Sequence, residues 1–331
     1  MPGRTRFLWM AIITVITIYC LILVGGIVRA TGAGMGCPDW PTCFGQWIPP
    51  TSESQLPLNY QEIYADRGYA DTEFNVRKTW TEYLNRLLGV ITGFTILLTF
   101  LFSIVYRRIN KPVFMLALIG FILVCVQGWL GSRVVASNLN PGMITLHMLL
   151  AQLIVAIVIA SVLTAERKQL ATISLSRLPK AFFWLFGFAM VLGILQLVVG
   201  TQVREAVDII AKQSDYENRH LWLDNLPIVL EFHKYGAIPL VIINVWVAFA
   251  LITHTSSKLL KLFSITLIAL MLGTTVMGLS MDQLNLPMFA QPLHLWFASI
   301  IFGTQFAIWL TLRYAVQAQP AASLQPGTAV G

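Results

Sequence analysis

The sequence predicts an all-α integral membrane protein with eight transmembrane helices, arranged as two pseudo-symmetric four-helix bundles. The composition supports the membrane class, because 56% of the 331 residues are hydrophobic and 11% are charged, whereas soluble domains carry about 25% charged residues. The lengths of the apolar stretches support the helix count. A helix needs about 20 predominantly apolar residues to cross a bilayer, and the chain has eight such stretches. An internal repeat, described below, supports the two bundles.

We expect the eight helices at residues 7–29, 79–106, 112–133, 142–164, 180–203, 227–253, 258–281 and 289–315. Several contain Gly or Pro, which spanning helices tolerate because neighbouring groups satisfy the freed backbone. The segments 30–78 and 204–226 are then long loops on one side of the membrane, called the outer side here, together with the short loops 134–141 and 282–288. We expect the outer side to carry the function, because functional residues concentrate in loops held by a rigid scaffold.

The distribution of basic residues predicts the orientation. In an eight-span arrangement one side of the membrane receives Arg4, Arg6, Arg107, Arg108, Lys111, Arg167, Lys168, Arg177, Lys180, Lys258, Lys261 and Arg313. The positive-inside rule places that side, and both termini, in the cytoplasm. Glu166 is the exception among the acids, which otherwise lie outside or at helix ends. The net charge of +7 does not indicate nucleic-acid binding, since the basic residues are spread over short loops.

The beginning of the chain predicts the compartment. The first apolar stretch follows almost directly on the N-terminus and is too long for the apolar core of a signal peptide. We therefore expect an uncleaved first helix in a multi-pass protein of a bacterial cytoplasmic (inner) membrane.

The cysteines fall into two groups. Cys20 and Cys125 lie inside predicted spans, where free cysteines are usually buried packing residues. Cys37 and Cys43 lie in the first outer loop, which would face an oxidising compartment. Both a disulfide and a redox-active thiol pair are compatible with this spacing.

Four spans end in a similar pattern, which indicates a parallel duplication of halves at about 1–165 and 175–331. Each pattern is followed by an outer loop and then by a span with Asn or His near its start. Small residues also recur in membrane helices for packing alone, although internal repeats are frequent in membrane proteins. The recurring glycines are Gly25, Gly131, Gly200 and Gly278, and the following polar residues are Asn85, His147, His233 and His294.

His233 and His294 are candidates for a bis-imidazole haem site in the C-terminal half. Polar residues inside a membrane are costly and tend to be functional, and imidazoles from facing helices of a bundle commonly hold haem iron. The alternative is that each histidine is buried and hydrogen-bonded to a neighbouring helix. In the N-terminal half, His147 has Asn85 as its expected partner, and an amide oxygen is a poor ligand for haem iron. We therefore expect this site to bind haem through His147 alone, with one iron position weakly filled or open. This agrees with a porphyrin that enters and leaves the site, and equally with a half-site that has decayed.

Charged residues at the outer ends of the spans are further candidates. Glu82 lies on the same helix face as Asn85, one turn nearer the outer surface, where a carboxylate can take a proton; its alternative role is an ion pair with Arg86 or Lys78. Guanidinium and ammonium groups can bind haem propionates or contact lipid headgroups by snorkelling. The candidates are Arg29, Arg86, Arg133, Arg204 and Lys234.

The stretch from Gly25 to Pro50, GGIVRATGAGMGCPDWPTCFGQWIPP, resembles the first-loop signature of haem A synthases. The motif Glu82-Tyr-Leu-Asn85-Arg86 resembles that family's second-helix motif, which reads Glu-x-x-His-Arg. The likeness extends to the three histidines at 147, 233 and 294, and covers all eight spans. Asn85 departs from the family pattern, and the second outer loop, 204–226, has no cysteine.

The resemblance implies that the protein oxidises the C8 methyl group of haem O to the formyl group of haem A, for cytochrome oxidase assembly. It implies a haem b cofactor on His233 and His294, a haem O substrate near His147, Glu82 as the catalytic carboxylate, and Cys37 and Cys43 as the family's outer-loop pair. Haem O synthase, oxidase assembly factors and a second copy of the chain are the partners it suggests, besides the lipid bilayer.

Three other classes are alternatives to an enzyme. A membrane cytochrome b that only relays electrons usually stacks haems near both faces, whereas every candidate ligand here lies near the outer face. A haem carrier or assembly partner without catalysis agrees with the missing histidine at Asn85. A transporter agrees least, because the buried polar groups are few and regularly placed.

Overall fold

The structure is a computed structural model that describes residues 2–175, 178, 180–214 and 217–318. Within these residues, eight helices have the length and apolar composition needed to cross a membrane, and the remainder consists of short helices and loops with two isolated bridges, Cys43–Gln46 and Leu175–Thr255. The prediction of an all-α protein with eight membrane-spanning helices is therefore confirmed.

The long helices are α1 (Pro2–Ala30), α3 (Val76–Ser103), α4 (Lys111–Ala136), α5 (Pro141–Ala165), α7 (Lys180–Gln213), α8 (Val229–His254), α9 (Lys258–Gln283) and α10 (Ala290–Ala318). Two short α-helices, α2 (Tyr60–Ile63) and α6 (Arg167–Leu170), lie in connections, with 3₁₀ turns at Glu53–Gln55, Ala65–Arg67, Ile104–Tyr106, Arg219–Leu221 and Leu223–Asn225.

Polar caps begin several of the spanning helices. The side chain of Asn75 accepts a hydrogen bond from the backbone N–H of Lys78, that of Asn140 from Met143, and that of Ser257 from Leu260. A side-chain oxygen at this position satisfies one of the backbone donors that a helix start leaves without a partner. Each of these apolar runs therefore begins directly after a polar residue that fixes its first turn.

Helix α7 is longer than its apolar run predicts. It ends at Gln213 rather than at residue 203, so the first part of the expected loop 204–226 is helical. Val207 and Ala211 are buried in this extension and belong to a small apolar cluster with Trp222 and Leu286. The expected boundary was wrong because hydropathy measures how far a helix is apolar, whereas an amphipathic helix can continue beyond the membrane.

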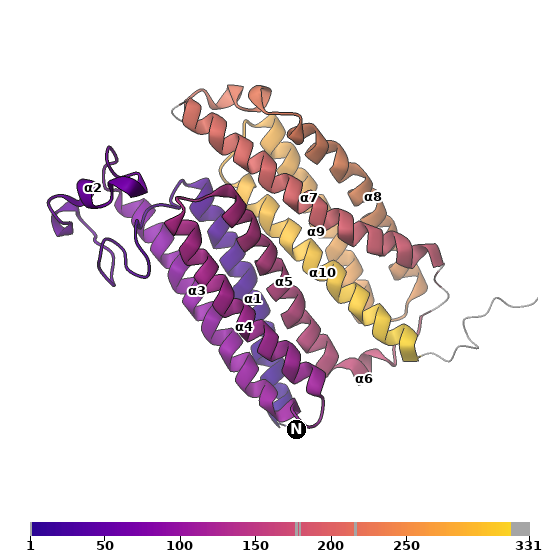
Figure 1. The fold of residues 1–331 in the computed structure, drawn as a ribbon. Helices are drawn as coiled ribbons and strands as arrows, with labels where there is room; N and C mark the ends of the chain where they lie inside the picture. Colours follow the sequence, from indigo (N-terminus) through magenta and orange to yellow (C-terminus); the bar gives the residue numbers. More distant parts are fainter. Residues whose placement is uncertain (1, 176–177, 179, 215–216, 319–331) are drawn as a thin grey trace, which may run out of the picture.

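The helices of the two halves lie in two adjacent groups, α1, α3, α4 and α5 in one and α7 to α10 in the other (Figure 1). Within the first group α1 contacts α3 and α5, and α4 contacts α3 and α5; in the second, α7 contacts α8 and α10, and α9 contacts α8 and α10. These matching contacts support the predicted pseudo-symmetry and the boundaries at 1–165 and 175–331, which stay predictions.

The two groups meet where α10 packs against α1 and α5. Gly26 lies so close to Pro292 that a Cβ atom would be 3.0 Å from it. The indole N–H of Trp296 donates to the backbone carbonyl of Tyr19 at 3.0 Å. Small residues allow helices in membranes to approach this closely, so the halves form a direct contact.

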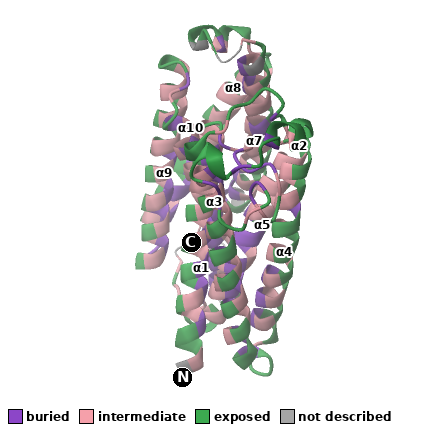
Figure 2. Ribbon diagram, turned by 90° about the vertical axis from the view of Figure 1, so that its left-hand side faces the viewer, coloured by how far each residue is buried: buried purple, intermediate pink, exposed green. Residues whose placement is uncertain are grey.

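Many residues on the outer faces of the helices are exposed (Figure 2), and they include many large hydrophobic side chains. Polar side chains are paired between helices inside the molecule. The amide of Gln305 donates to that of Asn244 at 2.6 Å. Cys20 and Cys125 are exposed on the outside of the helices, so the expectation that they are buried packing residues was wrong. An apolar composition does not separate a helix face that packs from one that meets lipid, because both faces are apolar.

The start of α1 lies at the end of the molecule away from the loop that carries α2, and so does the end of α10 (Figure 1). At this end Arg4 binds the carboxylate of Glu166 through two nitrogens, at 2.6–3.1 Å. Glu166, the acidic residue on the predicted cytoplasmic side, is thus paired with a basic residue of the same side.

Candidate functional site

Cys37 and Cys43 form a disulfide that closes a small ring in the first outer loop. The carboxylate of Asp39 lies inside the same loop and accepts hydrogen bonds from the backbone N–H groups of Phe44, at 2.6 Å, and Gly45, at 2.9 Å, as well as from the hydroxyl of Thr42. The alternative of a free thiol pair is not what the structure contains. Two independent constraints therefore hold this ring in one conformation.

Phe44 is the centre of an aromatic cluster beneath the ring. Tyr60, Tyr64, Tyr69 and Phe74 contact it edge-on, with ring centroids 5.3–6.2 Å away. Such edge-to-face pairs contribute about 0.5–1.5 kcal/mol each beyond the burial of their surface. The outer loop is therefore a small folded unit with its own core.

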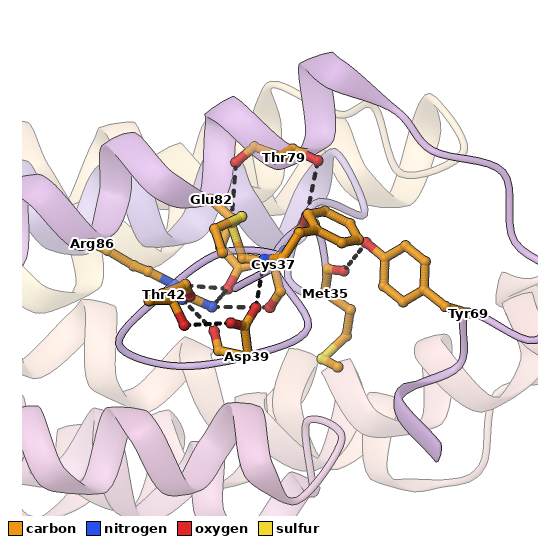
Figure 3. Close-up of polar contacts among 11 residues, drawn as sticks. Met35, Cys37, Asp39, Thr42, Tyr69, Thr79, Glu82 and Arg86 are labelled. Carbon is orange, nitrogen blue, oxygen red and sulfur yellow. Dashed lines mark hydrogen bonds and ion pairs between the residues drawn. A yellow bond between two sulfur atoms is a disulfide. The ribbon is translucent and has the colours of Figure 1, made fainter. Parts of the chain in front are cut away.

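Tyr69 joins this cluster to the start of the ring. Its hydroxyl donates to the carbonyl of Met35 at 2.7 Å (Figure 3). Burial raises the pKa of the Tyr69 phenol, so the group keeps the proton that it donates.

Helix α3 carries Glu82 directly under the disulfide ring. The side chain is buried, and its Oε2 accepts a hydrogen bond from the backbone N–H of Cys37 at 2.8 Å. Thr79, one turn earlier, donates to the carbonyl of Gly36 at 2.9 Å. A Cβ atom at Gly36 would overlap the carbonyl of Lys78, so glycine is required there for the loop to lie against the helix.

Arg86 connects Glu82 to the ring with all five of its N–H groups (Figure 3). Nε and Nη2 both bind Oε1 of Glu82, Nη2 also donates to the carbonyl of Cys37 at 3.0 Å, and Nη1 donates to the carbonyls of Asp39, at 2.6 Å, and Thr42, at 2.9 Å. The ion pair considered for Glu82 is therefore present. These contacts do not support a propionate contact by Arg86, because the chain itself already occupies its donors.

The C-terminal half brings together two of the predicted ligands. His233 on α8 and His294 on α10 face each other with ring centroids 6.0 Å apart. Nδ1 of His294 lies 3.0 Å from the carbonyl of Thr274, and the amide nitrogen of Gln196 donates to the carbonyl of His233. A hydrogen bond from Nδ1–H to a carbonyl fixes the tautomer with a free Nε2, as in metal-ligating histidines.

Each of the four polar residues in the repeat lies against a glycine of the preceding long helix. A Cβ atom at the glycine would lie 3.1–3.8 Å from the ring or amide, so the missing side chain provides the space in which the polar group lies. The pairs are Gly25 with Asn85, Gly131 with His147, Gly200 with His233 and Gly278 with His294.

The N-terminal site differs in its partners. The amide nitrogen of Gln127 donates to the backbone carbonyl of His147 at 3.0 Å. Among the described residues, Nδ1 of His147, Oε1 of Gln127 and Oδ1 of Asn85 are buried without hydrogen-bond partners. Buried polar atoms of this kind are rare and call for an explanation, such as a bound group.

Residues 8–306 match the family described as COX15-CtaA, cytochrome oxidase assembly protein. The chain belongs to this family. Similar proteins include the haem A synthase of Chelativorans sp., 26% identical over 351 aligned positions that cover 97% of this chain and 96% of the relative. The haem A synthase of Shewanella oneidensis is 24% identical over 308 positions, 85% of this chain and 88% of the relative. That of Ehrlichia canis is 33% identical over 162 positions, 44% of this chain and 45% of the relative.

Membership of the COX15-CtaA family implies haem, and the residues present fit that group. A metal–imidazole bond is about 2.0–2.1 Å long, so rings 6.0 Å apart leave space for one metal ion between two imidazole nitrogens. A porphyrin supplies its own equatorial ligands, so one or two histidines suffice. In the described residues no group of three or more His, Cys, Asp or Glu side chains could hold a metal ion alone.

The other basic candidates bind acidic residues of the chain. Arg29 donates to Asp208 at 2.8 Å and to Gln291 at 2.9 Å, and Arg204 lies 3.7 Å from the same Asp208. Two guanidinium groups thus share one carboxylate between the halves. The Nε atoms of Arg29 and Arg204 are buried and have no hydrogen-bond partner in the described chain. This leaves them a donor for an anionic ligand, whereas Arg86 has none free.

Lys234 and Arg133 differ from this pair. Lys234 forms an ion pair with Asp282 at 2.6 Å, and Arg133 is exposed. Sequence reasoning did not single out Asp208 or Gln291. Asp208 lay in a segment expected to be a loop, and no spacing rule connects Gln291 to Arg29. These residues become recognisable as partners only when α1, α7 and α10 are packed together.

Proposed function

We propose that this chain is a haem A synthase, which oxidises the C8 methyl group of haem O to the formyl group of haem A. The observation that carries the proposal is the buried Glu82 carboxylate held by Arg86 and the disulfide ring, at one end of a helix bundle whose partner bundle pairs His233 with His294. Near-full-length similarity to proteins named haem A synthase supports it.

The C-terminal half holds haem b through His233 and His294 in this proposal. Held by these two imidazoles, the haem would supply electron transfer. Thr274 fixes the ring of His294 through Nδ1, and Gln196 holds the backbone of His233. These residues orient the imidazoles without contributing to the chemistry on the substrate.

The N-terminal half receives haem O, with His147 as the residue that holds its iron. Gln127 fixes the backbone of His147. Glu82 is the catalytic carboxylate, and its role is to hold or accept a proton beside the substrate methyl group. Arg86 and the N–H of Cys37 fix the carboxylate in one orientation, and the disulfide ring covers it, which limits the access of water.

We further propose a bacterial inner membrane as the location, with both termini in the cytoplasm and the disulfide ring on the opposite side. The excess of basic residues at the end of the molecule where α1 begins supports this orientation, and a disulfide agrees with an oxidising compartment. Haem O and lipid are the direct partners. Haem O synthase, oxidase assembly factors and a second copy of the chain stay expectations of the family.

The test is haem extraction, chromatography and mass detection after expression in a host that makes haem O but not haem A. Haem A is expected with the natural chain, and haem b without haem A is expected with Glu82→Ala. Haem A formation by Glu82→Ala at the natural level would exclude the catalytic assignment. Haem b alone with the natural chain, in membranes rich in haem O, would support a cytochrome b or a haem carrier, and of these two Asn85 favours the carrier.

A further inference from the structure

The four glycine-facing positions of the repeat do not have the same supporting residues. In three of them, a polar side chain one turn before the glycine hydrogen-bonds the backbone carbonyl of the facing histidine. The distances are 3.0 Å for Gln127 to His147 and 3.5 Å for Thr274 to His294, and Gln196 makes the same bond to His233. A polar residue four positions before glycine thus accompanies each histidine.

The first position of the repeat differs from the other three in two residues, the supporting residue before the glycine and the residue that faces the glycine. Leu21 stands four residues before Gly25, where the other helices carry Gln or Thr, and Asn85 stands where the other helices carry His. A leucine side chain has no hydrogen-bonding atom. The first position therefore lacks both an imidazole and the polar side chain that would orient one, and these two differences agree with each other.

Asn85 lies in the same relation to Gly25 as His233 does to Gly200. A Cβ atom at Gly25 would be 3.8 Å from Oδ1 of Asn85, and one at Gly200 would be 3.1 Å from the ring of His233. Oδ1 is buried and has no hydrogen-bond partner in the described part of the chain. The amide therefore occupies the ligand position of the repeat, with an atom that binds iron much more weakly than imidazole.

We propose that the iron of haem O takes one protein ligand in this chain, His147, and that its second axial position faces Asn85 and stays open to small ligands. This inference rests on the proposed function, because it assigns the coordination of the substrate in the N-terminal site. The haem b iron, between His233 and His294, has no open position. The two haems therefore differ in coordination number, which follows from the residues at two corresponding positions.

The open position makes it easier for the porphyrin in the N-terminal site to exchange. A porphyrin held by one iron–imidazole bond leaves after that single bond breaks, whereas a haem with two such bonds must break both. Haem O has to enter the N-terminal site and haem A has to leave it, while haem b stays. One ligand for the exchanging haem and two for the resident haem agree with these different requirements.

The experiment uses the purified full chain carrying haem b and haem O, reduced with dithionite and titrated with carbon monoxide while the optical spectrum is recorded. Carbon monoxide is expected to bind an amount of haem equal to the haem O content, with haem b unchanged. In the oxidised protein, electron paramagnetic resonance should show a high-spin signal for haem O and a low-spin signal for haem b.

Two variants restore the pattern of the other three positions. Asn85→His, and Asn85→His combined with Leu21→Gln, should convert haem O to low spin and lower its affinity for carbon monoxide at least tenfold, with the larger effect in the double variant. The low-spin haem b spectrum reports folding in each case. The matched control is His233→Asn, which should make haem b high-spin and reactive with carbon monoxide, with His294 as the remaining ligand.

The outcomes separate this inference from the proposed function. Haem O that is bound, low-spin and unreactive with carbon monoxide in the natural chain would overturn the coordination proposed here and leave the proposed function standing. A chain that keeps haem b but binds no haem O when supplied with it would overturn the proposed function, and this inference with it. Loss of haem O binding in His147→Ala, with haem b retained, is the expected result for the remaining ligand.

Discussion

Glu82 and Glu231 occupy comparable places near the outer ends of α3 and α8, yet their surroundings differ. Glu82 is 4% exposed and lies beneath the disulfide ring, whereas Glu231 is exposed. The spacing to the next candidate ligand also differs, because Asn85 follows Glu82 by three positions and His233 follows Glu231 by two. Only the N-terminal half therefore has a carboxylate on the same helix face as its candidate ligand position.

The candidate histidine sites also differ between the halves, but here the C-terminal half is the more complete one. His233 and His294 face each other and have hydrogen-bonding neighbours, whereas Asn85 and His147 keep buried atoms that have no partner in the described residues. The more complete pair of candidate ligands thus lies in the half without the buried carboxylate. A duplicated helix bundle can provide a resident cofactor site in one half and a substrate site in the other, because the loop and a few side chains decide the chemistry.

The largest effect is expected from removing all histidine ligands of one haem. His233→Ala combined with His294→Ala should abolish haem b binding and leave haem O bound, and His147→Ala should do the reverse, because each variant removes every imidazole ligand from one half. The measurement is the haem content of the purified variants by extraction and chromatography. His220→Ala, a change outside both sites, is the control. Loss of both haems from either variant would show that the halves are not separate sites.

The next effect concerns Arg86, which binds Glu82 and the ring. Arg86→Lys should reduce haem A formation at least tenfold, because lysine has three donors in place of five and cannot span the same acceptors. Arg86→Ala should add a loss of about 3–5 kcal/mol in stability, as expected when one partner of a buried ion pair is removed. Thermal unfolding separates the two effects.

Lys78→Ala is the matched control for Arg86, since Lys78 is a basic residue of the same helix that is not among the hydrogen-bond or ion-pair partners of Glu82 in the described chain. Haem b content should stay at the natural level in all three variants. Full activity of Arg86→Lys would contradict a positioning role for the guanidinium. It would show that haem A formation requires only a positive charge at this position.

A smaller effect is expected from opening the disulfide. Cys37→Ser with Cys43→Ser should destabilise the protein by about 2 kcal/mol, because the cross-link closes a short loop, with a sequence separation of 6. Haem A formation should fall only partly, since Asp39 and Arg86 still hold the ring. Adding Asp39→Ala should produce a further loss. If the serine variant alone were inactive while keeping its fold and both haems, the cysteines would have a redox role.

The smallest effects are expected from adding a methyl group beside each ligand. Gly200→Ala places a Cβ atom 3.1 Å from the ring of His233, Gly131→Ala places one 3.4 Å from His147, and Gly25→Ala leaves 3.8 Å to Asn85. Spectral shifts should therefore decrease in that order, with haem b affected in the first variant and haem O in the second. A larger shift in Gly25→Ala than in Gly200→Ala would contradict this geometry.

Much of the fold and part of the site could be predicted from residue order. The boundaries of most spans follow from apolar length and from caps such as Asn75 and Asn140, because both are local properties. The pairing of Glu82 with Arg86 is likewise local, since four positions separate them on one helix. The end of α7 was not predictable in this way, because Val207 and Ala211 are stabilised by packing against residues distant in sequence.

By itself, the sequence determined the membrane class, the number of spans, the outer position of the candidate ligands and the family resemblance, since these depend on composition and on spacing along the chain. The tertiary structure decided which partners those residues have. It closed the disulfide, placed Glu82 against Cys37, brought Arg29 to Asp208 and set His233 opposite His294. The disulfide lies within one loop, but each of the other contacts joins residues from different elements, and only the packing of helices and loops fixes the distance between such residues.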